Sequence, residues 1–264
     1  MRPTPAQRAR ARLRGRAARK TAAAGLNPLK LRGIDIACER LSGRSLADLG
    51  AAWGVEGGYA FYAAERLGLD RVVIVDEDLE RYAALSERAA STSVVELVEG
   101  NFGDSAVAPK VGAVDIVLLF DVLLHQVSPS DWRQVLSLYA TETRSFVLAG
   151  PWWTGAETIR LPELGRERYL EAVPEMEIHD ELFDRIDEIN PQRGIPWRDC
   201  HDVWQWGISD GDLREEMRRR GFELAHFENH GAWTYCDAQG RDRALTHFFN
   251  GLYVFTRADG TTGA

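Results

Sequence analysis

A pattern of acids and glycines near the start of the chain carries the clearest chemical signal. Asp48, Gly50 and Gly54 follow the spacing D-x-G-x-x-x-G, and Asp76 comes later, at the end of a β-branched run. Glycine lets a backbone turn sharply and approach a ligand closely, while an ionised carboxylate accepts hydrogen bonds from both hydroxyls of a ribose. Dinucleotide sites use G-x-G-x-x-G instead, so this spacing disfavours a diphosphate.

The elements that must position these residues form a predicted βαβ unit over residues 45–78. Leu46 and Leu49 suit a buried strand, and residues 59–67 suit the helix that follows. Residues 72–75 are a β-branched run, which is typical of a parallel strand buried on both faces. Ligands bind outside the carboxyl ends of such strands, and the sequence places Asp76 there.

The turn and its acid resemble the class I S-adenosylmethionine-dependent methyltransferases, whose first motif is D/E-x-G-x-x-x-G followed by an acid after the second strand. The resemblance extends over residues 45–256 through the order of elements. It implies a doubly wound α/β fold with a mostly parallel seven-stranded sheet, whose last strand is antiparallel. It also implies S-adenosylmethionine as the cofactor and S-adenosylhomocysteine as the product.

The resemblance assigns a set of cofactor-binding residues: Asp48, Gly50, Ala51, Gly54, Asp76, Glu77, Asn101, Phe102 and Asp121. Asn101 stands where many relatives have Asp for the adenine amino group, and an amide oxygen accepts a hydrogen bond as a carboxylate does. Phe102 suits either an adenine face or the ordinary core, with equal weight.

Asp121 has two readings, as a contact for the methionine ammonium or as a ligand of Mg²⁺, which catechol-type relatives use. Residues 149–151, at the end of the fifth strand, contain no acid, so Mg²⁺ is the less favoured reading and no metal ligand is assigned. The chain also lacks an N/D-P-P-Y/F motif after the fourth strand. Methylation of nitrogen in DNA or protein amides is therefore disfavoured.

The rest of the chain continues the alternation of strands and helices. Helices are expected within residues 26–41 and at 79–90 and 131–139, and strands at 94–98, 114–120, 145–149, 222–227 and 248–255. Ser130 is the expected N-cap of the helix over 131–139. Ser209 and Asp212 suggest a capping box for a helix that ends at residues 220–221. A polar hairpin containing Gly231, Asp237 and Gly240 should join the last two strands.

His125 follows the fourth strand and is the candidate catalytic base. A neutral imidazole is available near pH 7, and a hydroxyl acceptor benefits from a base during methyl transfer. Packing or capping is the competing interpretation. The rivals are the five other histidines, His179, His201, His226, His230 and His247.

An insertion at residues 151–206 departs from a minimal methyltransferase and contains five of the eight tryptophans. Residues 175–189 suit an amphipathic helix, so the insertion is expected to form a helical, aromatic lid over the cofactor. Indole faces and carboxylates suit a polyhydroxylated acceptor. The candidate acceptor contacts are Trp152, Trp153, His201 and Trp204. Alternatively, the tryptophans build the core of the lid.

Composition bounds the class of protein. The 264 residues suit one domain at 25–256, between a basic arm at 1–24 and a tail at 257–264. The first twenty residues carry eight bases and no acid, which leaves 24 bases against 40 acids elsewhere, so nucleic acid is an unlikely partner. Three scattered cysteines suit a reducing cytoplasm, and no apolar run is long enough to span a membrane.

These observations predict an S-adenosylmethionine-dependent O-methyltransferase for a hydroxylated small-molecule or saccharide acceptor. Two alternatives stay open. One is a nucleic-acid methyltransferase or binding module that uses the basic arm, and the other is a non-catalytic subunit that binds S-adenosylmethionine. The sequence leaves the oligomeric state open.

Overall fold

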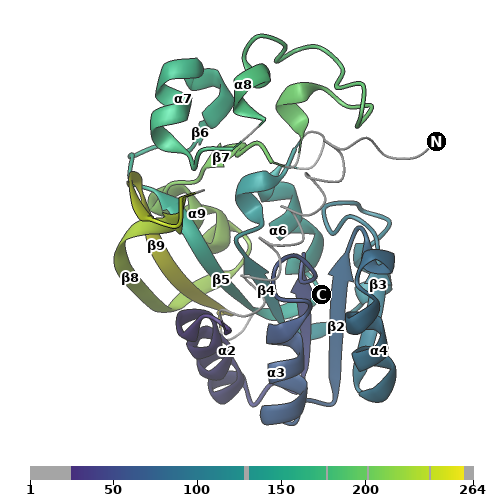
Figure 1. Ribbon diagram of the computed structural model, residues 1–264. Helices are drawn as coiled ribbons and strands as arrows, with labels where there is room; N and C mark the ends of the chain where they lie inside the picture. The colour runs from purple at the N-terminus through teal and green to yellow at the C-terminus, as the bar shows by residue number, and fades with distance from the viewer. Residues whose placement is uncertain (1–24, 128–130, 177, 201, 238, 259–264) are drawn as a thin grey trace, which may run out of the picture.

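A seven-stranded sheet runs through the centre of the computed structural model, which describes residues 25–127, 131–176, 178–200, 202–237 and 239–258 (Figure 1). The strand order is β3-β2-β1-β4-β5-β9-β8. The strands are β1 (Ser45–Leu49), β2 (Arg71–Asp76), β3 (Val95–Glu99), β4 (Val114–Phe120), β5 (Thr143–Trp153), β8 (Phe222–Cys236) and β9 (Asp242–Arg257). Strands β1 to β5 are parallel, and β9 is antiparallel to both neighbours. The predicted sheet is confirmed.

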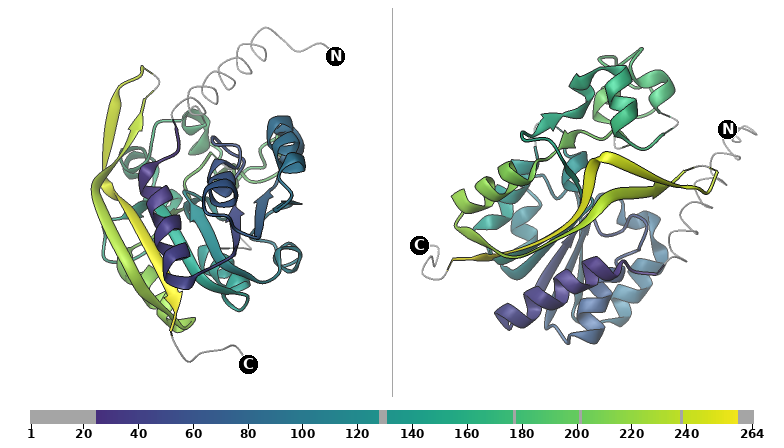
Figure 2. Two further views of the ribbon diagram at one scale, coloured as in Figure 1. Left: turned by 90° about the horizontal axis from the view of Figure 1, so that it is seen from below. Right: turned by 90° about the vertical axis from the view of Figure 1, so that its left-hand side faces the viewer.

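Helices cover both faces of this sheet (Figures 1 and 2). One face is covered by α2 (Pro28–Leu41), α3 (Gly58–Arg66) and α4 (Ala83–Ser91), and the other by α5 (Ala108–Val111), α6 (Trp132–Ala140) and α9 (Asp210–Arg219). Because helices pack on both sides, β4 is almost wholly apolar, as its sequence VDIVLLF predicts. No helix of the described ranges is long and apolar enough to cross a membrane.

Two predicted helices differ from the structure at their starts. A short 3₁₀ helix, η1 (Leu79–Arg81), precedes α4, so the single helix expected over residues 79–90 is wrong. The N-cap of α6 is Asp131, whose Oδ1 accepts a hydrogen bond of 2.9 Å from the Gln134 backbone N–H. Ser130, the predicted cap, lies outside the described residues.

The last hairpin is longer than predicted. β5 was expected to end at residue 149, but its pairing with β9 continues through Trp152 and Trp153. β8 continues to Cys236, so Gly231 lies within a strand rather than in the connecting turn. Irregular register between residues 229 and 233 lets the strand bend there without ending. The outer half of the hairpin therefore extends past the other strands (Figure 2, right).

The insertion folds into short elements above the sheet (Figure 1). They are β6 (Ile159–Arg160), η3 (Leu161–Leu164), α7 (Arg166–Ala172), α8 (His179–Leu182), η4 (Trp197–Asp199) and β7 (Trp206–Gly207). The helix predicted over residues 175–189 is wrong, because α8 is the only helix among the residues of this range that the structure describes. The carbonyls of Ile186 and Glu188 accept hydrogen bonds from the backbone of residues 198 and 197, a tertiary pairing that replaces helical bonds.

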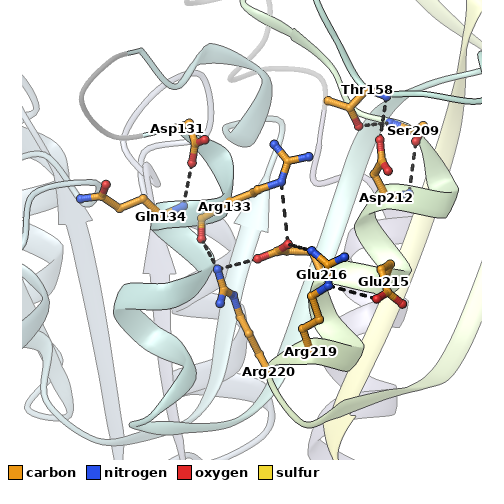
Figure 3. A network of polar contacts seen from close by, with 10 residues as sticks. All are labelled: Asp131, Arg133, Gln134, Thr158, Ser209, Asp212, Glu215, Glu216, Arg219 and Arg220. Carbon is orange, nitrogen blue, oxygen red and sulfur yellow. Dashed lines mark hydrogen bonds and ion pairs between the residues drawn. The ribbon is translucent and has the colours of Figure 1, made fainter.

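One carboxylate ties the insertion to α9 (Figure 3). Ser209 caps α9 as predicted, accepting a hydrogen bond of 3.2 Å from the Asp212 backbone N–H. In a capping box the Asp212 side chain would return to the Ser209 N–H. Here it accepts a hydrogen bond of 2.7 Å from the Thr158 backbone N–H, and the Thr158 hydroxyl accepts one of 3.1 Å from the Ser209 N–H. The first turn of α9 therefore anchors the insertion.

Candidate functional site

The glycine turn after β1 is held tightly between two neighbouring strands. The backbone N–H groups of Gly50 and Ala51 both donate to the Val75 carbonyl, at 2.8 and 3.4 Å. Gly50 has φ +73°, and a Cβ placed on it would lie 2.8 Å from Cγ1 of Val122. Gly54, with φ +77°, also needs the left-handed region. Only glycine fits position 50, because a side chain there would clash with Val122 and strain the backbone.

The acids and amides predicted to hold a nucleoside meet at the carboxyl ends of β2 and β3. Asp76 Oδ2 accepts a hydrogen bond of 2.8 Å from the Ala52 backbone N–H, so the acid braces the turn. The Asn101 side-chain amide donates to Glu77 Oε1 and accepts a hydrogen bond of 2.7 Å from the Gly103 N–H. Glu77 and Asn101 are exposed, and Asp76 is half-buried.

Phe102 is part of the core and also borders the turn. Its side chain is buried among apolar residues of one sheet face, and its carbonyl accepts a hydrogen bond of 2.9 Å from the Tyr139 hydroxyl. Its ring reaches to 3.1 Å from a Cβ placed on Gly50. Packing is therefore an observed role of Phe102, and contact with an adenine stays a prediction.

Asp48 has a buried carboxylate oxygen that lacks a hydrogen-bond donor among the described residues. The residue is 2% exposed, and Oδ2 has no hydrogen-bond partner among the described residues. Burial raises the pKa of Asp48 to about 7, against the opposing effect of the Lys30 charge. Buried polar atoms are normally satisfied, so this orphaned oxygen at the glycine turn points to a ligand that donates to it.

Lys30 is a site residue that the sequence analysis missed. From the first turn of α2 it forms an ion pair with Asp121, a residue with φ +58° at the end of β4. The Lys30 Nζ also lies 5.5 and 5.3 Å from the ring centroids of Tyr59 and Phe120. The missed signal is a cation in the first turn of a helix, where the helix dipole disfavours it.

The insertion is attached to the loop that carries His125. This residue ends the 3₁₀ helix η2 (Leu123–His125), and its ring meets the Trp204 ring edge-on at 6.3 Å. The Gln205 N–H donates to the Leu124 carbonyl at 2.9 Å, and the indole N–H of Trp206 donates to the Gln126 carbonyl at 2.8 Å. The insertion therefore covers the loop after β4.

The tryptophans named as acceptor contacts serve mainly as packing residues. Trp152 is 4% exposed, and its indole N–H donates to the Gly251 carbonyl at 3.1 Å. Trp204 is 7% exposed and packs edge-on against Trp233 and Phe248. These contacts leave little of either ring for a ligand.

Trp153 differs from them because it is only half-buried. Its ring stacks on the His247 ring, with centroids 5.5 Å apart and planes inclined by 21°. It is the predicted acceptor tryptophan that keeps accessible surface. His201, the fourth predicted contact, lies outside the described residues.

The charges at this edge of the sheet favour a ligand with a positive group. Asp48, Asp76, Glu77 and Asp121 lie at the carboxyl ends of their strands, and Lys30 reaches in among them from α2. Within the described ranges, no group of three or more His, Cys, Asp or Glu side chains could hold a metal ion. These carboxylates, which accept hydrogen bonds, suit a cationic, hydroxyl-bearing organic ligand.

No protein-family model and no curated protein matches the chain. Among solved structures, the chain is similar to the N-terminal domain of EvdMO1, crystallised in the presence of SAH, which is S-adenosylhomocysteine, and D-fucose. The identity is 14% and the TM-score 0.53, covering 89% of this chain and 85% of that one.

Two further solved structures share the fold. The 1,6-didemethyltoxoflavin-N1-methyltransferase of Burkholderia thailandensis, with 1,6-didemethyltoxoflavin and S-adenosylhomocysteine bound, is 14% identical with a TM-score of 0.55, covering 98% of this chain and 92% of that one. The O-methyltransferase of a trans-AT PKS multienzyme of Brevibacillus brevis, in complex with S-adenosylhomocysteine, is 8% identical with a TM-score of 0.53. Here the coverage is 88% of this chain and 73% of that one. At these identities the likeness is one of fold.

Proposed function

We propose, on the premise that the chain has the fold of the class I S-adenosylmethionine-dependent methyltransferases, that it binds S-adenosylmethionine and methylates a hydroxyl group of a small-molecule or saccharide acceptor. The observation that carries the proposal is the glycine turn. There Asp76 braces the Ala52 N–H, and Asp48 keeps an orphaned buried oxygen.

The residues at the turn fit the parts of this cofactor. Asp76 and Glu77 would accept hydrogen bonds from the ribose hydroxyls, and Asn101 would accept one from the adenine amino group through the second lone pair of its amide oxygen. Gly50, Ala51 and Gly54 allow close backbone approach. Asp48 and Asp121 would face the methionine ammonium.

The bound cofactor supplies a methyl group on a sulfonium, whose transfer is an in-line displacement. The contribution of the chain is to orient the acceptor, exclude water and take up a proton. His125 lies beneath the insertion in the loop after β4. We infer that its ring receives the proton of the acceptor hydroxyl as the new O–C bond forms and the S–C bond breaks.

The preference for a saccharide rests on two points. The similar EvdMO1 domain was crystallised in the presence of D-fucose, and the half-buried Trp153, stacked on His247, offers an aromatic edge near the hairpin. A nitrogen acceptor is the second candidate, because the similar toxoflavin enzyme is an N1-methyltransferase. The proposed location is the cytoplasm. Nucleic acid is a minor alternative acceptor, which the basic arm at residues 1–24 would recruit.

Titration calorimetry with S-adenosylmethionine and S-adenosylhomocysteine tests the cofactor. A micromolar dissociation constant, about −8 kcal/mol, is expected for both. Labelled methyl transfer to separate panels of sugars, phenols and amines then identifies the acceptor atom. Absence of binding to either nucleoside would refute the proposal. Binding without transfer to any panel would favour the non-catalytic subunit.

A further inference from the structure

The Lys30 ammonium lies among groups that stabilise a positive charge, namely Asp121, Tyr59, Phe120 and Asp48, which we call the Lys30 cage. Asp121 supplies the counter-charge, and the rings of Tyr59 and Phe120 flank the ammonium at centroid distances of 5.5 and 5.3 Å. The Lys30 side chain is only 12% exposed. Burial disfavours its charge, but Asp121, Tyr59 and Asp48 together outweigh burial and raise the pKa of Lys30 above its ordinary value. The lysine therefore remains protonated inside the site.

Neighbouring contacts fix the start of α2 over this cage. The Asn27 side chain caps the helix by accepting a hydrogen bond of 2.9 Å from the Leu29 N–H. The Asn27 backbone N–H donates to the Tyr59 hydroxyl at 3.0 Å, which joins the helix start to α3. With the helix start fixed, rotation of the four-carbon Lys30 stem can carry its ammonium away from Asp121 without a backbone movement.

The cage contains more acceptors than Lys30 uses. Asp48, which faces the same ammonium electrostatically, keeps Oδ2 without a hydrogen-bond partner among the described residues. Asp121 is 44% exposed on the open side of the ion pair. Two carboxylates and one cation on a four-carbon stem thus form a set that a ligand with both an ammonium and a carboxylate would complete.

We propose that Lys30 selects for ligands that carry a zwitterionic α-amino acid. In the ligand-free protein it holds the place of the ligand's ammonium. On binding, the ligand's ammonium takes over Asp48 and Asp121, and Lys30 turns to pair with the ligand's carboxylate. This inference rests on the proposed cofactor, and it adds that the same lysine discriminates against nucleosides that lack the carboxylate.

The physical reason is charge balance. A ligand with an ammonium but no carboxylate must compete with Lys30, a like charge in a buried site. A ligand with neither group leaves the Lys30 ion pair with Asp121 undisturbed. A ligand with both groups satisfies every charge, and each charge-assisted hydrogen bond is about twice as strong as a neutral one.

Calorimetric affinities of three unreactive nucleosides test the proposal. S-adenosylhomocysteine carries both charged groups, decarboxylated S-adenosylhomocysteine carries only the amine, and 5′-deoxy-5′-methylthioadenosine carries neither. Lys30→Met should weaken the first by about 10- to 100-fold, leave the third within about 2-fold, and tighten the second by about 3- to 10-fold once the competing cation is gone.

Two further variants keep the test sharp. Arg32→Met is the matched control, because Arg32 lies on the same helix, is mostly exposed and pairs with Glu228 at 2.9 Å instead; its three affinities should match wild type. Asp121→Asn, an isostere that removes the counter-charge, should weaken both amine-bearing ligands and spare 5′-deoxy-5′-methylthioadenosine. Circular dichroism verifies that each variant is folded.

The outcomes separate this inference from the function on which it rests. If wild-type protein binds none of the three nucleosides, the proposed cofactor fails and the inference fails with it. If wild type binds them but Lys30→Met changes all three affinities equally, or none, Lys30 does not select the amino-acid group, and only the inference is overturned.

Discussion

The carboxylate of Asp76 accepts a hydrogen bond of 2.8 Å from the backbone N–H of Ala52. The bond links the carboxyl end of β2 to the glycine turn after β1, so the acid that we propose for the ribose also shapes the loop beside it. A substitution at Asp76 therefore acts on the cofactor directly and through the turn.

Asp76→Asn and Asp76→Ala should separate these two effects. Asn keeps an oxygen for the Ala52 N–H but loses the charged acceptor, so cofactor affinity should fall by about 10-fold. Ala also releases the turn, so a fall of about 100-fold or more is expected. Calorimetry with S-adenosylhomocysteine measures both. Equal affinities for wild type and Asp76→Ala would remove Asp76 from the ribose site.

Asp48→Asn should change how stability depends on pH. Burial raises the pKa of Asp48 to about 7, above the unfolded value near 3.9. Between these values the folded protein holds a proton that the unfolded chain has released. The contribution of Asp48 to the free energy of unfolding is therefore fully present below pH 4 and is lost as pH rises through 7.

Wild type should consequently lose stability relative to Asp48→Asn on going from pH 5 to pH 8. At about 1.4 kcal/mol per pKa unit, the relative change is on the order of 2 kcal/mol. Urea unfolding at the two pH values measures it. A constant difference between the two proteins would show that Asp48 does not titrate in this window. The variant should also bind the cofactor more weakly, since its ammonium loses a charged acceptor.

His125→Ala should separate chemistry from binding. If the ring takes the acceptor proton, turnover should fall by about 100-fold or more, while affinity for S-adenosylhomocysteine stays within about 3-fold. His230→Ala is the control, since His230 is exposed on β8 and pairs with Glu228 at 2.8 Å. Steady-state rates with an identified acceptor measure the turnover of each variant. Wild-type turnover in His125→Ala would exclude it as the base.

Trp204→Ala should destabilise the insertion. Trp204 is buried against Trp233, Phe248 and the His125 ring, and loss of a buried tryptophan costs about 3–5 kcal/mol. Leu170→Ala, in the same insertion but 41% exposed, should cost less than about 1 kcal/mol. Denaturant unfolding compares the two. Similar small losses would show that the Trp204 ring is not held in a packed core.

Asp212→Asn should loosen the joint between the insertion and α9. The hydrogen bonds from Thr158 lower the pKa of Asp212 in the folded protein. The contribution of Asp212 to the free energy of unfolding is therefore present above the pKa of the unfolded chain, near 3.9, and is lost as pH falls through the lower pKa of the folded protein. Wild type should therefore lose its advantage over Asp212→Asn on acidification below pH 4. An advantage of the same size at pH 3 and pH 7 would contradict this role.

Local sequence patterns determined the strands and the glycine turn. The run of residues 114–120 is apolar and its strand matched the prediction residue for residue, because a strand covered on both faces has little choice of composition. Asp48, Gly50 and Asp76 came together at one edge because parallel strands place their carboxyl ends side by side.

Tertiary structure decided what short-range patterns do not encode. The apolar spacing of residues 175–189 is helical, but backbone pairing with residues 197–198 replaced the helix by turns. Trp204 became a packing residue because β9 extends beneath the insertion and places Phe248 against its ring. Trp152 instead packs in the core of the main sheet, edge-on against Tyr253 of β9. Lys30 entered the site because α2 crosses the sheet, bringing a cation next to Asp121, 91 residues away in the chain. Such contacts depend on how elements pack, and sequence spacing alone does not specify them.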